Sequence, residues 1–401
     1  MKSNAVFHTI DDFDVKGKCV LLRVDLNVPI QNGVVVDTLR IERILPTVRA
    51  LSKRGAKVVL LSHLGRPKGK IVPDLSLRAV VPPIEEALNQ RIAFSEDCVG
   101  NAAASVIAEL EWGKVALMEN LRFHPGEESN DEDFASALAE LGDIYVNDAF
   151  SCTHREHASI ERLAKKLPSA AGLVLRNELE TLKQILENPA RPVFAIVGGA
   201  KISTKLDIIN HLMKKMDSIA IMGAMANTFL LAKGFAVGTS LVEMSMVKKA
   251  GAILAEAEKE KCRILLPEDV VVATELRKNV SVKTISISAV PADRMILDVG
   301  PRTVALLSEN LRASKTLVWN GPLGAYETTP FDMATIAVAR IAADLTHEKK
   351  LLSIGGGGDT IAALHRVGLN ADFSYVSSAG GAFLDWLGGK KLPGIIALAT
   401  R

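Results

Sequence analysis

Short apolar runs, rich in β-branched residues, alternate with amphipathic helical patterns along the whole chain. The apolar runs predict strands over residues 19–28, 56–63, 91–95, 114–121, 143–150, 191–199, 218–225, 262–273, 315–321, 350–358 and 373–381. Stretches with helical spacing lie between them, for example residues 38–55 and 201–216. This alternation is typical of βαβ units, in which helices cover both faces of a parallel sheet.

The predicted strands are too many for a single sheet of ordinary size. A chain of 401 residues is also long for a single core. We therefore predict an α/β protein with two doubly wound domains, each built on a parallel sheet. The two prolines of "LENPARP", residues 186–192, mark the expected boundary, and the helical pattern over 176–188 is the expected connector.

Composition narrows the class of protein. Hydrophobic residues make up 48% of the chain and charged residues 23%, as in a soluble globular protein. The formal net charge of +2 argues against a nucleic-acid binder that works through bulk charge. Four scattered cysteines without a CxxC pair are typical of reduced thiols in the cytosol. We find neither a signal-peptide pattern nor an apolar run long enough to span a bilayer, so we expect a cytoplasmic protein without membrane contact.

Basic residues follow nearly every predicted strand of the first half. In "LLRVDLNVP" the side chains of Arg23, Asp25 and Asn27 are predicted to share one face of a strand, where a buried Arg–Asp pair that holds a loop is the alternative. The other members of the set are Arg40, His63, Arg66, Arg122, His124, His154, Arg155 and His157. The carboxyl ends of parallel strands form the ligand-binding edge of such a sheet, so these side chains should gather there.

Guanidinium groups match phosphate and carboxylate in two-point contacts, which predicts a small ligand with several negative charges. The set is too local for DNA, and it lacks the aromatic residues on which single-stranded nucleic acid stacks. The histidines do not predict a metal site, because their spacing lacks companion acids.

Glycines follow the predicted strands of the second half, in "VGGAKIS", "MGAMANTF", "WNGPLGAYE" and "GGGGDT". Glycine allows backbone N–H groups to approach phosphate oxygens, and a helix N-terminus adds further donors. Asp359 at the start of the last helix would repel a phosphate unless a divalent cation such as Mg²⁺ lies between them. The alternative is that Asp359 only caps its helix.

Two lysines begin the helical pattern that follows "VGG". Lys201 and Lys205 are predicted to lie at positions i and i+4 of the opening turn, on one face. Cations at a helix N-terminus oppose the helix dipole, so an anionic ligand is the expected reason for them. The chain has no P-loop and no clean GxGxxG motif, and the glycines alone therefore indicate no particular nucleotide.

Taken together, eight motifs closely resemble the phosphoglycerate kinase family. They are "LRVDLNVP", "SHLGRPKG", "ENLRFHPGEE", "VNDAF…HREHAS", "VGGAKISTKL", "WNGPLGAYE", "GGGGDT" and "GGKKLPG", and they run in the family's order from Leu22 to Gly394. The resemblance implies two Rossmann-like domains, at 1–175 and 191–380, joined by a hinge helix at 176–190. It also implies that residues 381–401 return to the first domain. The implied reaction is Mg²⁺-dependent and reversible, converting 1,3-bisphosphoglycerate and ADP to 3-phosphoglycerate and ATP in glycolysis.

The resemblance also implies roles for individual residues. The phosphoglycerate site would consist of Asp25, Asn27, Arg40, His63, Arg66, Arg122 and Arg155. The nucleotide site would consist of Gly198, Gly199, Lys205, Gly223, Pro322, Glu327, Gly356, Gly357, Gly358, Asp359 and Thr360, with Mg²⁺ at Asp359. Our hypothesis is that Arg40 and Lys201 stabilise the charge on the phosphoryl group in transit.

Three positions depart from the family's usual glycines, namely Ala224, Ala379 and Ser151. Family analogy indicates a monomer that acts on small molecules only and closes about its hinge. Two other functions fit the sequence less well. A nucleotide-dependent dehydrogenase should carry a dinucleotide fingerprint, which the sequence lacks. A binding module without turnover should have lost Arg40, Lys201 or Asp359, and all three are present.

Overall fold

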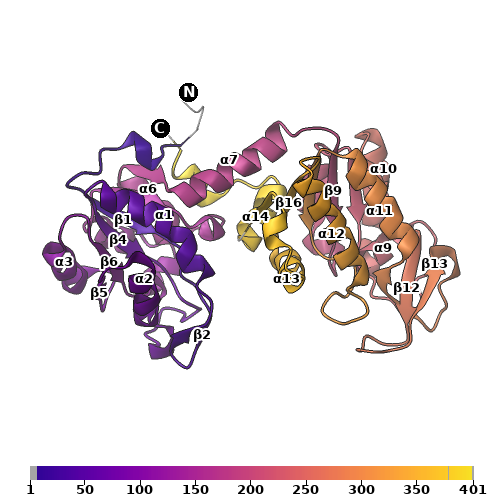
Figure 1. Ribbon diagram of the computed structural model, residues 1–401, viewed down its shortest axis with the longest axis horizontal. Helices are drawn as coiled ribbons and strands as arrows, with labels where there is room; N and C mark the ends of the chain where they lie inside the picture. Colours follow the sequence, from indigo (N-terminus) through magenta and orange to yellow (C-terminus); the bar gives the residue numbers. More distant parts are fainter. Residues whose placement is uncertain (1–6, 378, 400–401) are drawn as a thin grey trace. The chain divides into compact units, whose positions relative to one another are not determined.

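The computed structural model describes residues 7–377 and 379–399, apart from the side chains of residues 185 and 186. The chain divides into two compact units (Figure 1). Unit 1 comprises residues 1–180 and 391–401, and unit 2 comprises residues 181–390. The described helices include none that is both long enough and apolar enough to cross a bilayer.

Unit 1 is built on a six-stranded parallel sheet with the order β5-β6-β4-β1-β7-β8. Its strands are β1 (Cys19–Arg23), β4 (Lys57–Leu61), β5 (Ala93–Ser95), β6 (Val115–Met118), β7 (Ile144–Asn147) and β8 (Ser169–Ala171), and a small hairpin joins β2 (Ile30–Gln31) to β3 (Val34–Val35). The central strands are buried on both faces, which is why they read as continuous apolar runs.

Helices cover this sheet because their apolar residues recur every three or four positions. In α1 (Leu39–Lys53) the buried side chains are Ile41, Ile44, Leu45, Thr47, Val48 and Leu51. The other α-helices that begin in unit 1 are α2 (Val81–Leu88), α3 (Gly100–Glu109), α4 (Pro125–Glu128), α5 (Glu132–Ala139), α6 (Leu163–Lys166), α7 (Leu173–Glu187) and α15 (Pro393–Ile396). Short 3₁₀ turns lie at Ile10–Asp12, Pro73–Leu75, Leu77–Val80, Leu121–Phe123 and Phe150–Cys152, and one π turn lies at Ala158–Arg162.

Unit 2 contains a second six-stranded parallel sheet, with the order β11-β10-β9-β15-β16-β17. Its strands are β9 (Val193–Val197), β10 (Ser218–Ile221), β11 (Arg263–Leu265), β15 (Thr316–Asn320), β16 (Leu352–Gly355) and β17 (Tyr375–Val376). The helices are α8 (Leu206–Met213), α9 (Met225–Ala232), α10 (Val247–Lys259), α11 (Pro301–Ala313), α12 (Met333–His347), α13 (Gly358–Arg366) and α14 (Gly380–Leu387). Short 3₁₀ turns lie at Ile202–Thr204, Met244–Met246, Ile287–Ala289 and Asn370–Asp372.

The predicted fold class, with two parallel α/β sheets, is confirmed. The predicted strand over 262–273 was wrong in its extent. The segment around Pro267, in the middle of this range, separates β11 from β12 (Asp269–Ala273). Strand β12 belongs instead to an antiparallel sheet, β13-β12-β14, with β13 (Lys283–Ser286) and β14 (Met295–Val299). Neither β8 nor this sheet's outer strands were foreseen, because β8 is short and β13 is largely exposed.

Both parallel sheets reverse their strand order at one point. In unit 1, β4 lies on one side of β1 and β7 lies on the other, so the switch point is between β1 and β7. In unit 2 the switch point is between β9 and β15. Ligands of open α/β sheets bind at such switch points, beyond the carboxyl ends of the strands. The candidate residues of each unit follow these strand ends.

The end of the chain packs on unit 1. The N–H of Gly394 donates to the carbonyl of Thr153 at 2.9 Å, and Phe7 forms a β-bridge with Ala399. A Cβ at position 394 would meet Ile160 and the backbone of Thr153, so the close approach of the two segments requires glycine there.

Candidate active site

In unit 1, the loops after β1, β4 and β7 are joined by Asp25 and Asn27. The Asp25 carboxylate accepts hydrogen bonds from Arg40 and from the Ser151 hydroxyl. The Asn27 Oδ1 accepts from the N–H of Gly65 at 2.8 Å. The prediction that both side chains extend a strand face is wrong, because β1 ends at Arg23. Their alternating burial nevertheless continues into the loop.

Arg122 is a buried cation with spare hydrogen-bonding capacity. Only 2% of the residue is exposed. Its Nη1 donates to the carbonyl of Gly65 at 2.7 Å, and its Nε lies 3.3 Å from Glu128 Oε1. Its Nη2 is buried and makes no hydrogen bond with any residue that the structure describes. Burial, and then the charge of Arg155, lowers the pKa of Arg122. An unpartnered buried guanidinium N–H is a strong indication of an anionic ligand.

The remaining predicted arginines of unit 1 differ in setting. Arg155 is half-buried, and its Nε lies 3.3 Å from His154 Nε2. Arg122 and Arg155 both act on the pKa of His63, which places the three side chains in one electrostatic environment. Arg66 is exposed, and within residues 7–377 and 379–399 no hydrogen bond or ion pair brings it to the others.

A buried network beneath these residues was not foreseen. The guanidinium of Arg23 donates to Ser159 Oγ at 2.9 Å, and its Nη2 lies 3.1 Å from His63 Nδ1 and 4.0 Å from Glu127 Oε1. The alternative of an Arg23–Asp25 pair is therefore wrong. Glu127 and Ser159 lie inside motifs that carried the resemblance, but nothing in their spacing pointed to Arg23.

This network sets the protonation of His63. Because Arg23 can only donate, His63 Nδ1 accepts, and the ring proton lies on Nε2. Burial, followed by the charges of Arg23, Arg122 and Arg155, holds the pKa of His63 well below its usual range. His63 is therefore a neutral hydrogen-bond donor, not a cation.

In unit 2, a pocket of about 540 Å³ lies beyond the strand ends. Five residues of the predicted nucleotide site line it, namely Gly199, Gly223, Pro322, Glu327 and Asp359. Much of the remaining lining is apolar and comes from Leu241, Leu276, Met295, Ile296, Leu297, Val299 and Leu323. An apolar pocket with a few polar groups suits a flat ligand that carries charge at one end.

The predicted i, i+4 arrangement of Lys201 and Lys205 is wrong. A 3₁₀ turn, Ile202–Thr204, lies between them, and α8 begins only at Leu206. Lys201 is exposed, whereas Lys205 donates to the side chain of Asn320. Burial lowers the pKa of Lys205, and the charge of Asp359 opposes this shift, so Lys205 and Asp359 are electrostatic neighbours.

Asn320 was not predicted, although it lies in the quoted "WNGPLGAYE". Its Nδ2 donates to the carbonyl of Gly356 at 2.6 Å while its Oδ1 accepts from Lys205. The buried amide of Asn320 therefore fixes the position of Lys205 relative to the glycine loop. Thr360 adds a second link, because its Oγ1 accepts from the N–H of Gly321 at 2.6 Å.

The glycines of unit 2 serve packing more than the sequence indicated. A Cβ on Gly198 would overlap the carbonyl of Pro322, one on Gly356 would overlap the Phe383 ring, and one on Gly357 would overlap the Asn320 amide. Gly357 also has φ of +95°. Gly358 differs, because a Cβ there would meet no atom within 4 Å. Of this run, Gly358 is the position where a side chain would take up space open to a ligand.

Asp359 is free to bind a cation. It is exposed and lies in the first turn of α13, whose N-cap residue is Gly357 and not Asp359. The alternative that it only caps its helix is therefore wrong. No group of three ligating side chains surrounds it among the described residues. This donor set fits Mg²⁺, which commonly takes one carboxylate and completes its shell with phosphate oxygens and water.

Two polar residues of the pocket lining were not predicted from the sequence. Asp298 is 2% exposed, accepts from the N–H groups of Val299 and Ala334, and has a pKa that burial raises to about 8. Asn227 is 1% exposed and belongs to the first turn of α9. Neither follows a strand directly, which is the pattern by which the other candidates were found.

The three departures from the family's glycines fit the backbone. Ala224 has φ of −62° and Ala379 has φ of −107°, which side chains adopt readily. Ser151 lies in a 3₁₀ turn, and its hydroxyl donates to Asp25. None of the three positions requires glycine.

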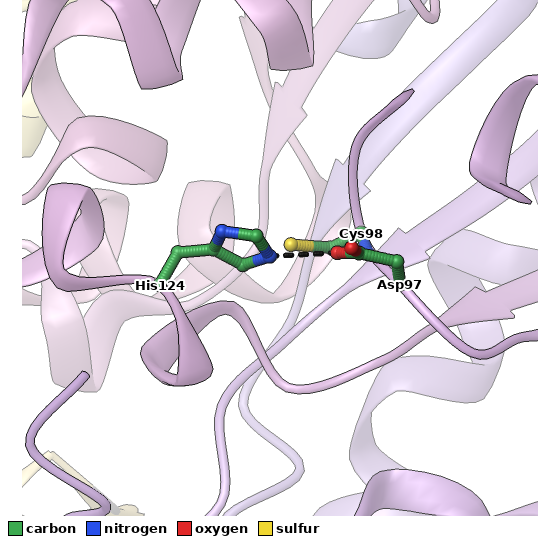
Figure 2. Close-up of side chains that lie close together, drawn as sticks. All are labelled: Asp97, Cys98 and His124. Atoms are coloured by element: carbon green, nitrogen blue, oxygen red, sulfur yellow. Dashed lines mark hydrogen bonds and ion pairs between the residues drawn. The ribbon is translucent and has the colours of Figure 1, made fainter. Parts of the chain in front are cut away.

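One histidine of unit 1, His124, has an acidic neighbour, which the spacing of the histidines in the sequence did not predict. His124 Nε2 lies 2.6 Å from Asp97 Oδ1, and the Cys98 thiol lies beside them (Figure 2). The three ligand atoms lie within 4.8 Å of one another. The acid comes 27 residues earlier in the chain, so local spacing could not reveal it. The Asp97–His124 pair by itself accounts for this geometry.

Comparisons with known proteins identify the family of this chain. The family model described as phosphoglycerate kinase matches residues 10–390. The chain is 55% identical to phosphoglycerate kinase from Rhizobium meliloti over 396 residues, covering 98% of this chain and 99% of the relative. It is 54% identical to the same enzyme from Methylorubrum extorquens, again over 98% of this chain and 99% of the relative.

Solved structures give the same result. The structure of phosphoglycerate kinase from Coxiella burnetii superposes with a TM-score of 0.91 at 38% identity, covering 98% of this chain and 100% of that chain. The enzyme from Pyrococcus horikoshii superposes with a TM-score of 0.81 at 30% identity, covering 98% of both chains. The resemblance is thereby confirmed, and the chain belongs to the phosphoglycerate kinase family.

Proposed function

We propose that this chain transfers the acyl phosphate of 1,3-bisphosphoglycerate to ADP, giving 3-phosphoglycerate and ATP, and that it also catalyses the reverse reaction. The step belongs to glycolysis and gluconeogenesis. The observation that carries the proposal is the presence of a separate anion site in each unit. Unit 1 offers Arg122 with a buried, unpartnered Nη2, and unit 2 offers a pocket bounded by glycines and Asp359.

Phosphoglycerate is assigned to unit 1, which corresponds to the domain expected at 1–175. Of the segment 381–401 that was expected to return to it, unit 1 contains residues 391–401. Arg122 and Arg155 would bind its phosphate and carboxylate, with Arg66 closing over the solvent side. His63 would donate from Nε2, as its neutral state requires. Asp25 and Asn27 would hold the hydroxyl end, and their bonds to Arg40 and to the N–H of Gly65 keep them in place.

The nucleotide is assigned to unit 2, the domain expected at 191–380. Gly198, Gly199, Gly223 and Pro322 would form the adenosine wall, and Glu327 would bind the ribose. Lys205, Gly356, Gly357, Gly358 and Thr360 would surround the phosphates. Mg²⁺ at Asp359 would neutralise phosphate charge when bound. The support is that Asp359 is exposed, is not the N-cap residue of α13, and interacts electrostatically with Lys205.

Transfer requires no covalent enzyme intermediate, because the acyl phosphate is already reactive. The β-phosphate oxygen of ADP forms the new P–O bond as the P–O bond to the carboxyl group breaks, and the carboxylate leaves. The protein would supply positioning and charge. We assign the charge stabilisation to Lys201 and Arg40, of which Lys201 is exposed and free of any capping bond.

Hinge bending at residues 176–190 is part of the proposal, because the two substrates are assigned to different units. Binding of both would exclude water that otherwise hydrolyses the acyl phosphate. Small-angle scattering should show compaction when both substrates are present. A scattering profile that both ligands leave unchanged would contradict this element.

The direct test is a coupled assay of ATP formation from 1,3-bisphosphoglycerate and ADP, with and without Mg²⁺. We expect turnover that requires the metal. Absence of ATP formation with Mg²⁺ present would refute the proposed activity. We further propose that the enzyme is a cytoplasmic monomer. Light scattering after size exclusion checks the oligomeric state, because a dimer would have twice the chain mass of 43.0 kDa.

A further inference from the structure

The lining of the pocket in unit 2 includes a buried polar atom that has no partner in the described part of the chain. Asn227 lines the pocket from the first turn of α9 and is 1% exposed. Its Nδ2 donates to the carbonyl of Leu241 at 3.2 Å. Its Oδ1 is buried and has no hydrogen-bond partner among the residues described. Buried amide oxygens are nearly always paired, so a partner from outside the chain is expected.

The identity of the free atom follows from chemistry. Only the amide NH₂ can donate to the carbonyl of Leu241. The flipped amide would place two acceptors against each other, so the bond to Leu241 fixes Oδ1 as the free atom. Asn227 therefore offers an acceptor, and its ligand must bring a donor.

The surroundings of Asn227 show which part of a nucleotide lies there. Leu241 belongs to the segment next to the start of β14, where the N–H of Ile296 donates to Ser240 Oγ at 2.8 Å. Leu241, Ile296 and the neighbouring Met295 all line the pocket and are apolar. Three acidic residues line the pocket. Glu327 comes from the loop after β15 and Asp359 from the first turn of α13. Asp298 of β14 is buried, and burial raises its pKa to about 8, so it carries little charge at neutral pH.

A nucleotide has an apolar, flat end and an anionic end. The phosphates belong near Asp359 and Lys205, which are electrostatic neighbours. The base then takes the apolar end, beside Asn227. On its edge an adenine base carries the 6-amino group, which is a hydrogen-bond donor, and its faces suit the surrounding aliphatic side chains.

We propose that Asn227 is a specificity-determining residue that accepts a hydrogen bond at Oδ1 from the exocyclic amino group of a 6-aminopurine nucleotide. The assignment rests on the proposed function, since it places the nucleotide in this pocket. It adds that the site distinguishes bases by a side-chain hydrogen bond. A pocket that used shape and apolar contact alone would accept any purine of similar size.

The first test uses the unmodified protein. Calorimetry with Mg²⁺ compares the affinity for ATP with that for purine riboside triphosphate, which has the same ring system without the 6-amino group. We expect the analogue to bind about five- to tenfold more weakly, as for the loss of one buried hydrogen bond. Equal affinities would overturn the assignment, and this arm needs no variant to fold.

The second test uses a variant and a matched control. Asn227→Ala should bring the affinity ratio of the two nucleotides close to one. Leu276→Ala, which alters an apolar residue of the same lining, should weaken both equally and leave the ratio as it is. A ratio unchanged by Asn227→Ala would overturn the assignment.

Failure of this inference and failure of the proposed function give different results. If wild type forms ATP but binds both nucleotides equally, only the role of Asn227 is wrong. If wild type binds neither nucleotide, the pocket is not the nucleotide site, and the assignment of Asn227 is overturned with it.

Discussion

The two units share a topology but build their sites from different material. In both units the candidate site residues follow strands at the switch point of a six-stranded parallel sheet. Unit 1 uses charged side chains such as Arg40, Arg122 and Arg155, carried on loops and supported by a buried network. Unit 2 uses main chain and glycine, and the charged residues of its predicted site are Lys205, Glu327 and Asp359. The fold therefore fixes where a ligand binds, and the loops decide how it is held.

The difference follows from how each site manages charge. Unit 1 buries the Arg122 cation with one backbone acceptor, the carbonyl of Gly65, and with an ion pair to Glu128, and it leaves Nη2 without a hydrogen-bond partner among the described residues. Unit 2 keeps its loop close-packed, and a buried amide, Asn320, connects the glycine run to Lys205. The first arrangement should be sensitive to loss of single side chains, and the second to added methyl groups.

The largest expected effect comes from removing the buried cation of unit 1. Arg122→Ala should lower kcat/KM for phosphoglycerate by about a hundred- to a thousandfold, because truncating a buried, charged hydrogen-bonding partner typically costs 2–5 kcal/mol. Steady-state kinetics in the ATP-consuming direction measures this effect. Circular dichroism should confirm that the variant folds.

Arg66 provides the matched control for Arg122. It is exposed and has no partner in the part of the chain that the structure describes. Arg66→Ala should therefore cost about tenfold less than Arg122→Ala, as solvated charge contacts contribute less. If the two variants lost the same activity, burial would not distinguish the two arginines.

The second effect concerns transfer and not binding. Lys201→Ala should lower kcat by about a hundredfold with little change in KM for ADP, because a charge that acts mainly in the transition state is lost. Arg40→Ala should behave likewise toward ADP. Wild-type turnover in Lys201→Ala would refute its role, and an effect confined to the KM for ADP in Arg40→Ala would count against that assignment.

The sequence was most informative where chemistry and position coincide in a single residue. A charged side chain directly after an apolar strand is visible in the sequence, so the arginines of unit 1 could be named in advance. Partners such as Glu127 and Asn320 act through contacts formed in three dimensions, and their types are common throughout the chain. The 3₁₀ turn between Lys201 and Lys205 was missed because helical spacing there resembles that of a regular helix.

The third effect separates two kinds of glycine in one loop. Gly357→Ala should destabilise unit 2 by about 1–3 kcal/mol, because its φ of +95° and the Asn320 amide both oppose a methyl group. Chemical denaturation measures this loss of stability.

Gly358→Ala is the matched partner of Gly357→Ala. The added methyl group would meet no protein atom within 4 Å. The fold should keep its stability, while KM for nucleotide rises about tenfold because the methyl group takes space from the phosphates. A destabilised Gly358→Ala with unchanged KM would reverse the roles assigned to these two glycines.

The smallest expected effect is a difference in how the two units respond to pH. In unit 1, burial holds the pKa of His63 well below the unfolded value of 6.5 and lowers that of His157 to about 3. The unfolded chain then binds more protons than the folded one below pH 6.5, so unit 1 should lose stability as the solution becomes acidic. In unit 2, burial raises the pKa of Asp298 from 3.8 to about 8. Here the folded chain binds more protons between those values, and the contribution of Asp298 to stability should fall as pH rises from about 4 to about 8.

Hydrogen exchange measures the two units separately, through the amides of β1 in unit 1 and of β15 in unit 2. After correction for the intrinsic rate, protection of β1 should decrease below pH 6.5, and protection of β15 should decrease toward pH 8. Asp298→Asn should flatten the second trend without altering the first, because an amide cannot titrate. If β15 kept its pH dependence in that variant, Asp298 would not be the responsible group. The contrast between the units would then rest on their ligand-binding chemistry alone.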